Sequence, residues 1–407
     1  MNASELFGEA TKVGQVVQAP GNLEGATVAT SQYLRCDGRW VLRADLTANF
    51  LSKYTTPGNI TMTARTLAAA PATASIAKNA TYFAAAGVAG AGTQIQTSTD
   101  GITYTSRAGD GTANGLAAVV YGTAKFVIKS VGNNYPYHQA DPTVAFTQAA
   151  TFTGVDASSA CNCLAYSASL GRILWVGNFT ASTSYAATTN DDGANWSAQT
   201  VASAATKQQC CWTGSNFLVT NTDVPGMIQS SATGLTGAWS DIQTGFAYAT
   251  STTLPTIASD GANNAVMIAA DGCSLLVSHD HGATWGRRLL PTAHGNAAPS
   301  KVVSVSCANG IFFAAMDAAI TTSSTNVFMS SNGDVWLPPG PAVSTSFIGH
   351  AVAYKAGVYA AIRSANTSAA TFTIGTTHVR LPDSQRSTAS AAGFGVNSGF
   401  QEFIRVR

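Results

Sequence analysis

The stretch Ser278-His279-Asp280-His281-Gly282-Ala283-Thr284-Trp285 decides the architecture of this chain, because the same phrase recurs along it. Its fixed positions read S-x-D-x-G-x-T-W, and residues 189–196 repeat them with Thr and Asn in place of Ser and Thr. Self-similarity at a fixed period indicates a repeat architecture. Looser copies occupy residues 98–104, 230–239 and 330–336, and a degenerate copy lies near residues 141–146.

The aromatic residue that closes each copy gives the period of the repeat. Trp196, Trp239, Trp285 and Trp336 follow one another at intervals of roughly 40–50 residues, and Tyr104 precedes Trp196 by about two intervals. Short apolar runs separated by turns precede each phrase, and no segment shows a 3.6-residue apolar period. This pattern is typical of a propeller blade, a four-stranded sheet that needs neighbours to bury its faces.

The phrase resembles the Asp-box, or bacterial neuraminidase repeat, of sialidase-type β-propellers and their non-enzymatic relatives, over about residues 70–385. The resemblance implies a turn between the third and fourth strands of each blade. In that turn the Asp accepts backbone hydrogen bonds, the Gly takes a positive φ and the aromatic residue packs between blades. These structural roles fall to Asp100, Gly101, Tyr104, Asp191, Gly193, Trp196, Trp239, Ser278, Asp280, Gly282, Thr284, Trp285, Gly333 and Trp336.

We therefore predict an all-β fold: a β-propeller of seven Asp-box-type blades over residues 59–407, behind an attachment segment over residues 1–58. Residues 59–67 alternate like a closing strand, and residues 390–407 resemble the opening hairpin of the other units. We expect these two segments to pair and close the ring. The pairing would form either a clasp on seven blades or a composite eighth blade.

The charge of the chain restricts its partners. Only 10% of the 407 residues are charged and the formal net charge is +1, which argues against nucleic acid or an anionic membrane as the main partner. The N-terminus lacks the basic start and apolar core of a signal peptide, and no apolar run is long enough to span a membrane. The odd count of seven cysteines is not a disulfide framework, so we expect folding in a reducing compartment.

No cofactor or metal site is predicted. Residues 161–163 and 210–211 bring cysteines into the innermost strands expected for neighbouring blades, but neither C-x-C nor C-C is a zinc-ribbon spacing. We interpret these cysteines as small core residues. His279 and His281 flank a turn Asp, where we expect solvated side chains.

Catalysis is not expected either. Sialidase chemistry, as the resemblance implies it, needs three arginines on the substrate carboxylate, a Tyr nucleophile and a Glu. The four glutamates are Glu5, Glu9, Glu24 and Glu402, so none lies between residues 25 and 401. A general glycosidase would need two carboxylates about 5–10 Å apart. Most Asp residues stand in turn contexts instead, so we predict a protein that is not an enzyme.

The N-terminal segment carries a second resemblance. Leu34-Arg35-Cys36-Asp37-Gly38 resembles the L-x-C-D-G opening of phage tail-collar modules, although the Trp of the usual Pro-Gly-Trp lead is missing after Pro20-Gly21 and residues 40–43 depart from the usual pattern. With a nearly uncharged propeller behind it, this favours a bacteriophage virion protein, a tail fibre, spike or decoration. Its expected partners are other tail proteins, through residues 1–58, and a host-surface glycan or a second copy of the chain. It would assemble in the host cytoplasm and reside in the virion. A glycan-cleaving spike enzyme and a bacterial propeller scaffold stay open as alternatives.

The closing aromatic residue gives the first testable prediction. Replacing Trp285 by Ala should lower the free energy of unfolding by about 3–5 kcal/mol, because a large buried ring would be lost between two blades. Urea denaturation of both proteins measures the change. An unchanged midpoint would contradict the packed role of the ring.

Overall fold

The structure is a computed structural model of the whole 407-residue chain. It describes residues 60–374 except 72, 87–94, 108–115, 131–134, 155–159, 179–185, 202–206, 222–223, 225, 252–253, 291–300, 317–326, 335, 337–349 and 364–366, and outside this range it describes five further strands. The described residues contain strands and turns but no helix, so none of them provides a helical membrane span.

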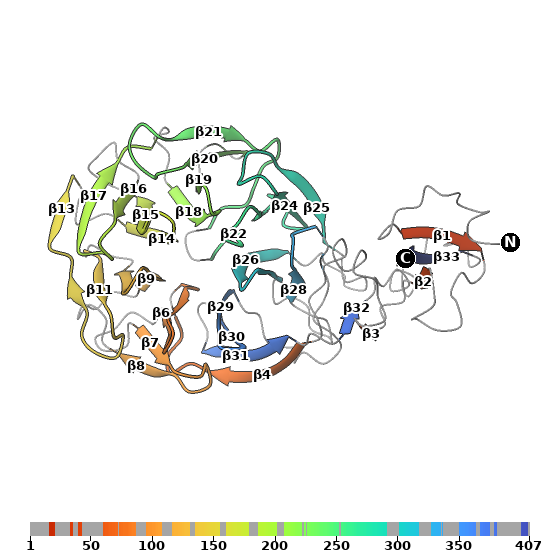
Figure 1. The fold of residues 1–407 in the computed structure, drawn as a ribbon, viewed down its shortest axis with the longest axis horizontal. Coiled ribbons are helices and arrows are strands. Elements are labelled where there is room, and N and C mark those ends of the chain that lie inside the picture. Colours follow the sequence, from red (N-terminus) through yellow and green to blue (C-terminus); the bar gives the residue numbers. More distant parts are fainter. Residues whose placement is uncertain are drawn as a thin grey trace.

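Seven sheets stand around a central axis as the blades of a β-propeller (Figure 1). The prediction of an all-β, seven-bladed ring is confirmed. In blades 1 to 3 the chain runs from the innermost strand outward. Their strands are β5 (Ile76–Lys78), β6 (Phe83–Ala86), β7 (Ile95–Ser98) and β8 (Thr105–Arg107); β9 (Leu116–Tyr121), β10 (Phe126–Ser130), β11 (Tyr137–Gln139) and β12 (Thr147–Gln148); and β14 (Ala160–Ser167), β15 (Arg172–Asn178), β16 (Ala186–Thr189) and β17 (Asn195–Gln199), with β13 (Thr151–Thr153) added in parallel outside β17.

Blades 4 to 6 continue in the same direction around the axis, and blade 6 has three described strands. Antiparallel neighbours pair in each sheet, as expected for successive hairpins. The strands are β18 (Lys207–Trp212), β19 (Phe217–Asn221), β20 (Met227–Ser231) and β21 (Ser240–Gln243); β22 (Ile257–Ser259), β23 (Ala265–Ile268), β24 (Ser274–Ser278) and β25 (Gly286–Leu289); and β26 (Val302–Ala308), β27 (Ile311–Met316) and β28 (Val327–Ser330).

Blade 7 closes the ring with strands from both parts of the chain. It contains β29 (Ala351–Lys355), β30 (Val358–Ile362) and β31 (Ser368–Ile374), and its outermost strand is β4 (Ile60–Thr66). The register runs from Ser368 opposite Thr66 to Ile374 opposite Ile60. Since β4 precedes blade 1 in sequence, this pairing ties the last blade to the first without a covalent link.

The predicted pairing of residues 59–67 with residues 390–407 is therefore wrong in its partner. The open edge of β31 offers seven consecutive positions, and β4 fills all of them. The C-terminal strand β33 (Phe400–Arg405) instead lies between β1 (Val16–Pro20) and β2 (Tyr33–Arg35), in a sheet outside the ring (Figure 1). A second pair joins β3 (Trp40–Leu42) to β32 (His378–Arg380). No composite eighth blade forms among the described residues.

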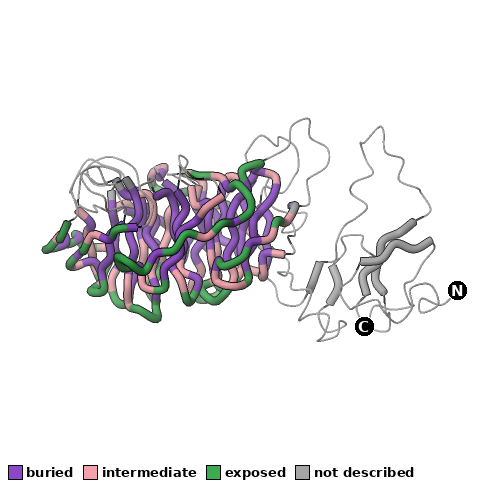
Figure 2. Tube along the Cα trace, turned by 90° about the horizontal axis from the view of Figure 1, so that it is seen from above, coloured by how far each residue is buried: buried purple, intermediate pink, exposed green. Residues whose placement is uncertain are grey.

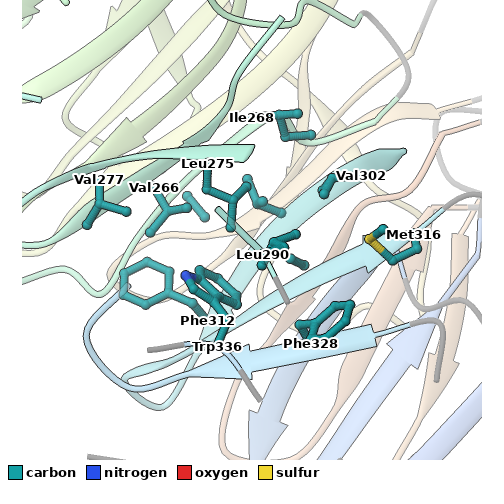
Figure 3. Packing of buried hydrophobic residues seen from close by; sticks show 13 residues of the cluster. Val266, Ile268, Leu275, Val277, Leu290, Val302, Phe312, Met316, Phe328 and Trp336 are labelled. Atoms are coloured by element: carbon teal, nitrogen blue, oxygen red, sulfur yellow. The ribbon is translucent and has the colours of Figure 1, made fainter. Parts of the chain in front are cut away.

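The hydrophobic core is divided among the interfaces between blades. Each of the seven interfaces holds at least one cluster of buried side chains, because both faces of every sheet are covered by a neighbour. Figure 3 shows the cluster between blades 5 and 6, where Val266 and Val277 meet Phe312, Phe328 and Trp336. Seen edge-on, the ring is a disc with purple, buried residues through its thickness and exposed residues at its edges (Figure 2).

The closure strand gives the second prediction. A variant of residues 67–374 lacks β4 and should aggregate, because it leaves the edge of β31 unpaired. A control variant of residues 43–374 keeps β4, loses β1 to β3 together with their partner strands β32 and β33, and should remain monodisperse. Size-exclusion chromatography with light scattering distinguishes the two. Monomeric, equally stable behaviour of the shorter variant would overturn this account of closure.

Candidate functional site

The turn at residues 278–285 is held together by its own side chains. The Asp280 carboxylate accepts hydrogen bonds from the Thr284 amide at 2.8 Å, the Thr284 hydroxyl at 2.5 Å and the Ser278 hydroxyl at 2.8 Å. The Gly282 amide donates to the Ser278 hydroxyl at 2.9 Å. The turn therefore satisfies its own polar groups, as an Asp-initiated turn does.

In other copies an Asp or Asn side chain also accepts a backbone amide of its own turn, from four residues on at Asp191 and from two residues on in looser copies. Asp191 accepts from the Asn195 amide at 3.0 Å, and Asp100 accepts from the Ile102 amide at 2.8 Å. Asn332 takes the place of Asp and accepts from the Asp334 amide at 3.0 Å. In the degenerate copy, Asp141 accepts from the Thr143 amide at 2.9 Å. Blade 7 has no such turn among its described residues, since β4 reaches it from the other part of the chain.

These hydrogen bonds lower the pKa of the turn aspartates Asp280 and Asp191. Burial raises the pKa of Asp280, but the hydrogen bonds from Thr284 and Ser278 outweigh it and hold the pKa below its ordinary value. The same balance, with Thr189 and Asn195 as donors, lowers the pKa of Asp191. Both side chains are therefore ionised at neutral pH and use their oxygens to accept the hydrogen bonds of their own turns.

The glycines of three turns lie directly against the preceding blade. Gly282 has φ +89°, and a Cβ there would stand 2.6 Å from the Leu218 side chain of β19. At Gly193 and Gly333 the corresponding distances are 2.9 Å to Val127 and 2.7 Å to Val277. Only glycine meets both requirements, a left-handed backbone and a close approach.

The closing aromatic residues seal the same interfaces. Trp196, Trp285 and Trp336 are buried, and each indole N–H donates to the carbonyl of the turn glycine, at 3.0, 2.9 and 2.5 Å. Trp239 is buried between blades 3 and 4, and its indole N–H has no partner among the described residues. Tyr104 lies between blades 7 and 1.

Polar bridges between blades surround the turns. Asp192 accepts from the Thr123 and Ala124 amides of blade 2, at 2.6 and 2.9 Å. His281 lies 2.9 Å from the Thr213 carbonyl of blade 4, and His279 lies 3.0 Å from the Asp334 carboxylate of blade 6. Both side chains therefore join neighbouring blades; His279 is exposed, as expected for a turn residue, whereas His281 is half-buried.

The space suited to a ligand lies on the axis rather than at these turns. One cavity of about 550 Å³ is lined by the innermost strands, including Ala118, Asn162, Gln209 and Ser306. A second, of about 630 Å³, adjoins it where those strands end, and Val120, Leu164, Cys307 and Asn309 line both. We call the second cavity the axial mouth. Its further lining residues include Tyr166, Ser169, Trp212, Ser259 and Asp260.

Aromatic side chains recur at or next to the C-terminal end of four innermost strands, β9, β14, β18 and β29. Tyr121, Trp212 and Tyr354 each stand opposite a buried aromatic residue of the next strand in the same hairpin. Tyr166 takes the same register position opposite Ile173. These residues are half-buried, and Trp212 packs against Phe217 with ring centroids 4.7 Å apart. Sequence reasoning missed them, although they recur with the same period as the turns.

The axial mouth holds a single carboxylate among its described lining residues. Asp260 accepts from the Ala262 amide at 2.9 Å, the Asn264 amide at 3.1 Å and the Asn264 side-chain amide at 2.5 Å. Both of its oxygens are thus committed to its own turn. No described acid lines the 550 Å³ cavity. An acid–base pair of the kind that glycosidases use is absent from both sets of described lining residues.

The cysteines of residues 161–163 and 210–211 lie in β14 and β18, the innermost strands of neighbouring blades, as predicted. The Cys163 thiol donates to the Cys210 carbonyl at 3.4 Å across the interface between β14 and β18. Burial raises the pKa of the Cys161 and Cys211 thiols, so they stay protonated at neutral pH. Among the described residues, no three His, Cys, Asp or Glu side chains gather as metal ligands.

Comparison with known proteins identifies the class of this protein. No family model and no curated protein matches the chain. It is similar in structure to virginiamycin B lyase from Staphylococcus aureus, at 8% identity and TM-score 0.55 over 77% of this chain and 99% of that one. YCF48 from Cyanidioschyzon merolae is 12% identical, with a TM-score of 0.51 over 77% of this chain and 98% of that one. Chaetomium thermophilum Raptor is 10% identical, with a TM-score of 0.53 over 82% of this chain and 30% of that one. The chain is a β-propeller protein, and at these identities the likeness shows the fold alone.

The turn glycine gives the third prediction. Gly282→Ala should lower the free energy of unfolding by about 2–5 kcal/mol, since it adds a left-handed alanine to an overpacked contact with Leu218. Gly261→Ala is a matched control, with φ +76° and nothing within 4 Å of the added Cβ, and should cost about 1–2 kcal/mol. Urea denaturation measures both. Equal costs would show that the approach to Leu218 is unimportant.

The turn carboxylate gives the fourth prediction. Because the folded-state pKa of Asp280 lies below its ordinary value, its charge stabilises the fold at neutral pH. That contribution should fall away as the pH drops from about 4 through the lower folded-state value. Asp280→Asn should be less stable at pH 7 and lose less stability in acid, as followed by urea denaturation at several pH values. Parallel pH profiles of the two proteins would exclude this role.

Proposed function

We propose that this chain is a non-enzymatic bacteriophage virion protein, of the tail fibre, spike or decoration type, that presents its propeller for attachment to the host surface. It would assemble in the host cytoplasm and reside in the particle. Two features support this function: the described turn and mouth carboxylates are hydrogen-bonded within their own turns, and the N-terminal and C-terminal strands pair with each other.

The described carboxylates of the turns and of the axial mouth are committed to structure. Asp100, Asp191 and Asp280 hold their own turns, and Asp260 at the axial mouth does the same. The chain has no Glu between residues 25 and 401. General acid–base work needs a carboxyl group that can reach a substrate and exchange a proton. The commitment of Asp260 is the single observation that carries the non-enzymatic proposal.

The two chain ends pair with each other rather than with the blades. Strands β1 and β2 flank β33, and β3 pairs with β32, so N-terminal and C-terminal residues share sheets that contain no blade strand. The segment with the tail-collar-like Leu34-Arg35-Cys36-Asp37-Gly38 belongs to this part of the chain. Such an arrangement supports docking through the N-terminal segment, with tail proteins as partners and the propeller as the presented part.

Purified phage particles test the virion role, as the fifth prediction. Particles produced by cells that carry this coding sequence should contain the chain after density-gradient centrifugation, as detected by mass spectrometry. A variant that lacks residues 1–58 should stay out of the particles. Particles that lack the full-length chain would favour a bacterial scaffold and overturn the proposal.

A hydrolysis assay tests the absence of catalysis. Purified full-length protein should release no sugar from sialosides or from isolated host surface polysaccharide, as followed by chromatography of the products. Asp260→Asn serves as the matched variant. Release by the full-length protein that disappears in this variant would identify a glycan-cleaving spike enzyme instead.

A further inference from the structure

The axial mouth combines aromatic surface with polar groups. Tyr166 of blade 3 and Trp212 of blade 4 both line it and are half-buried. The Tyr166 hydroxyl is held by Thr123 at 3.0 Å, and Phe217 supports the Trp212 ring. Two rings fixed by their neighbours on one cavity wall form a rigid platform at low entropic cost.

Uncharged hydrogen-bonding groups surround this platform. Ser169 is exposed beside Tyr166, and Asn309 is exposed at the boundary with the 550 Å³ cavity. Ser306 lines that adjoining cavity, but its hydroxyl oxygen is buried and is not offered to a ligand there. The volume of about 630 Å³ is that of a small-ligand site.

The charged residues at the axial mouth indicate whether it suits an anionic, a cationic or a neutral ligand. No Lys or Arg is among its described lining residues, since Lys78 lines only the adjoining 550 Å³ cavity, and its one carboxylate, Asp260, is committed to its own turn. A carboxylate or phosphate ligand would find no cation there, and a cationic ligand would compete with the amides for Asp260. A purely apolar ligand would leave the serine and asparagine groups unpaired. Rings plus neutral polar groups suit a molecule that has both an apolar face and hydroxyls.

We infer that the axial mouth is a binding site for a neutral saccharide, with one sugar face on Trp212 and Tyr166 and hydroxyls bonded to Ser169 and Asn309. This inference rests on the proposed attachment function and gives it a location. The proposed site lies beside the axis, where the innermost strands end, and the repeat turns take no part in binding. No bond forms or breaks at the site.

A glycan array tests the inference with the full-length chain. The probes are neutral oligosaccharides and their sialylated counterparts, and hits are measured again by titration in solution. The chain should retain neutral oligosaccharides and show no preference for sialylated ones. Trp212→Ala should weaken binding roughly tenfold or more, as truncation of an aromatic anchor does, while Trp212→Phe should retain most of it. Phe246→Ala, at an exposed aromatic residue that does not line the mouth, should bind unchanged.

Ser169→Trp covers the case in which Trp212→Ala fails to fold, because it fills the mouth from an exposed position. Full binding by a folded Trp212→Ala or Ser169→Trp variant would overturn the inference, and so would absence of neutral glycan binding by the full-length chain. If binding is absent while the chain sediments with virions, the inference fails and the virion role stands. If a chain missing from virions binds neutral glycan through Trp212, the saccharide site stands and the virion role fails.

Discussion

The contact between a turn glycine and the preceding blade is the constraint on which the ring depends. At Gly282 the backbone comes so close to Leu218 that no side chain fits, and Gly193 and Gly333 repeat this against Val127 and Val277. The aspartate closes the turn and the tryptophan bonds to the glycine carbonyl, so three residue types fix one local shape. At these three turns a blade seals the one before it, and the cores between those blades depend on the turns being correctly formed.

Ring closure also determines where the chain ends go. Strand β4 completes blade 7 beside β31, so the segments that precede β4 and follow β31 leave the ring from the same blade. Their nearness in space brings β3 to β32 and β1 to β33. One pairing thus stabilises the ring and places both chain ends together, where they form sheets that contain no blade strand.

The residues that carry structure and those proposed to carry binding are different in kind. Asp, Gly and Trp at the outer turns carry structure, and Asp100, Asp191 and Asp280 hold their own turns there. Binding is proposed where the innermost strands end, at Tyr166 and Trp212, beside hydroxyl and carboxamide groups. Because the axial mouth collects one strand end from each of several blades, a ligand there would contact residues far apart in sequence.

The sequence by itself determined the architecture: the period of the turns predicted blades, and the Asp, Gly and Trp of residues 278–285 predicted their own local contacts. Those contacts are local, so a short window contains every partner. It did not determine which strand closes the ring, since residues 60–66 and 400–405 both have strand character and alternation says nothing of the partner across the sheet. It also did not reveal the inter-blade roles of His279 and His281, or the meeting of Tyr166 and Trp212 at one cavity. Tertiary structure alone decided these, because each depends on a distance between residues that only the closed ring brings together.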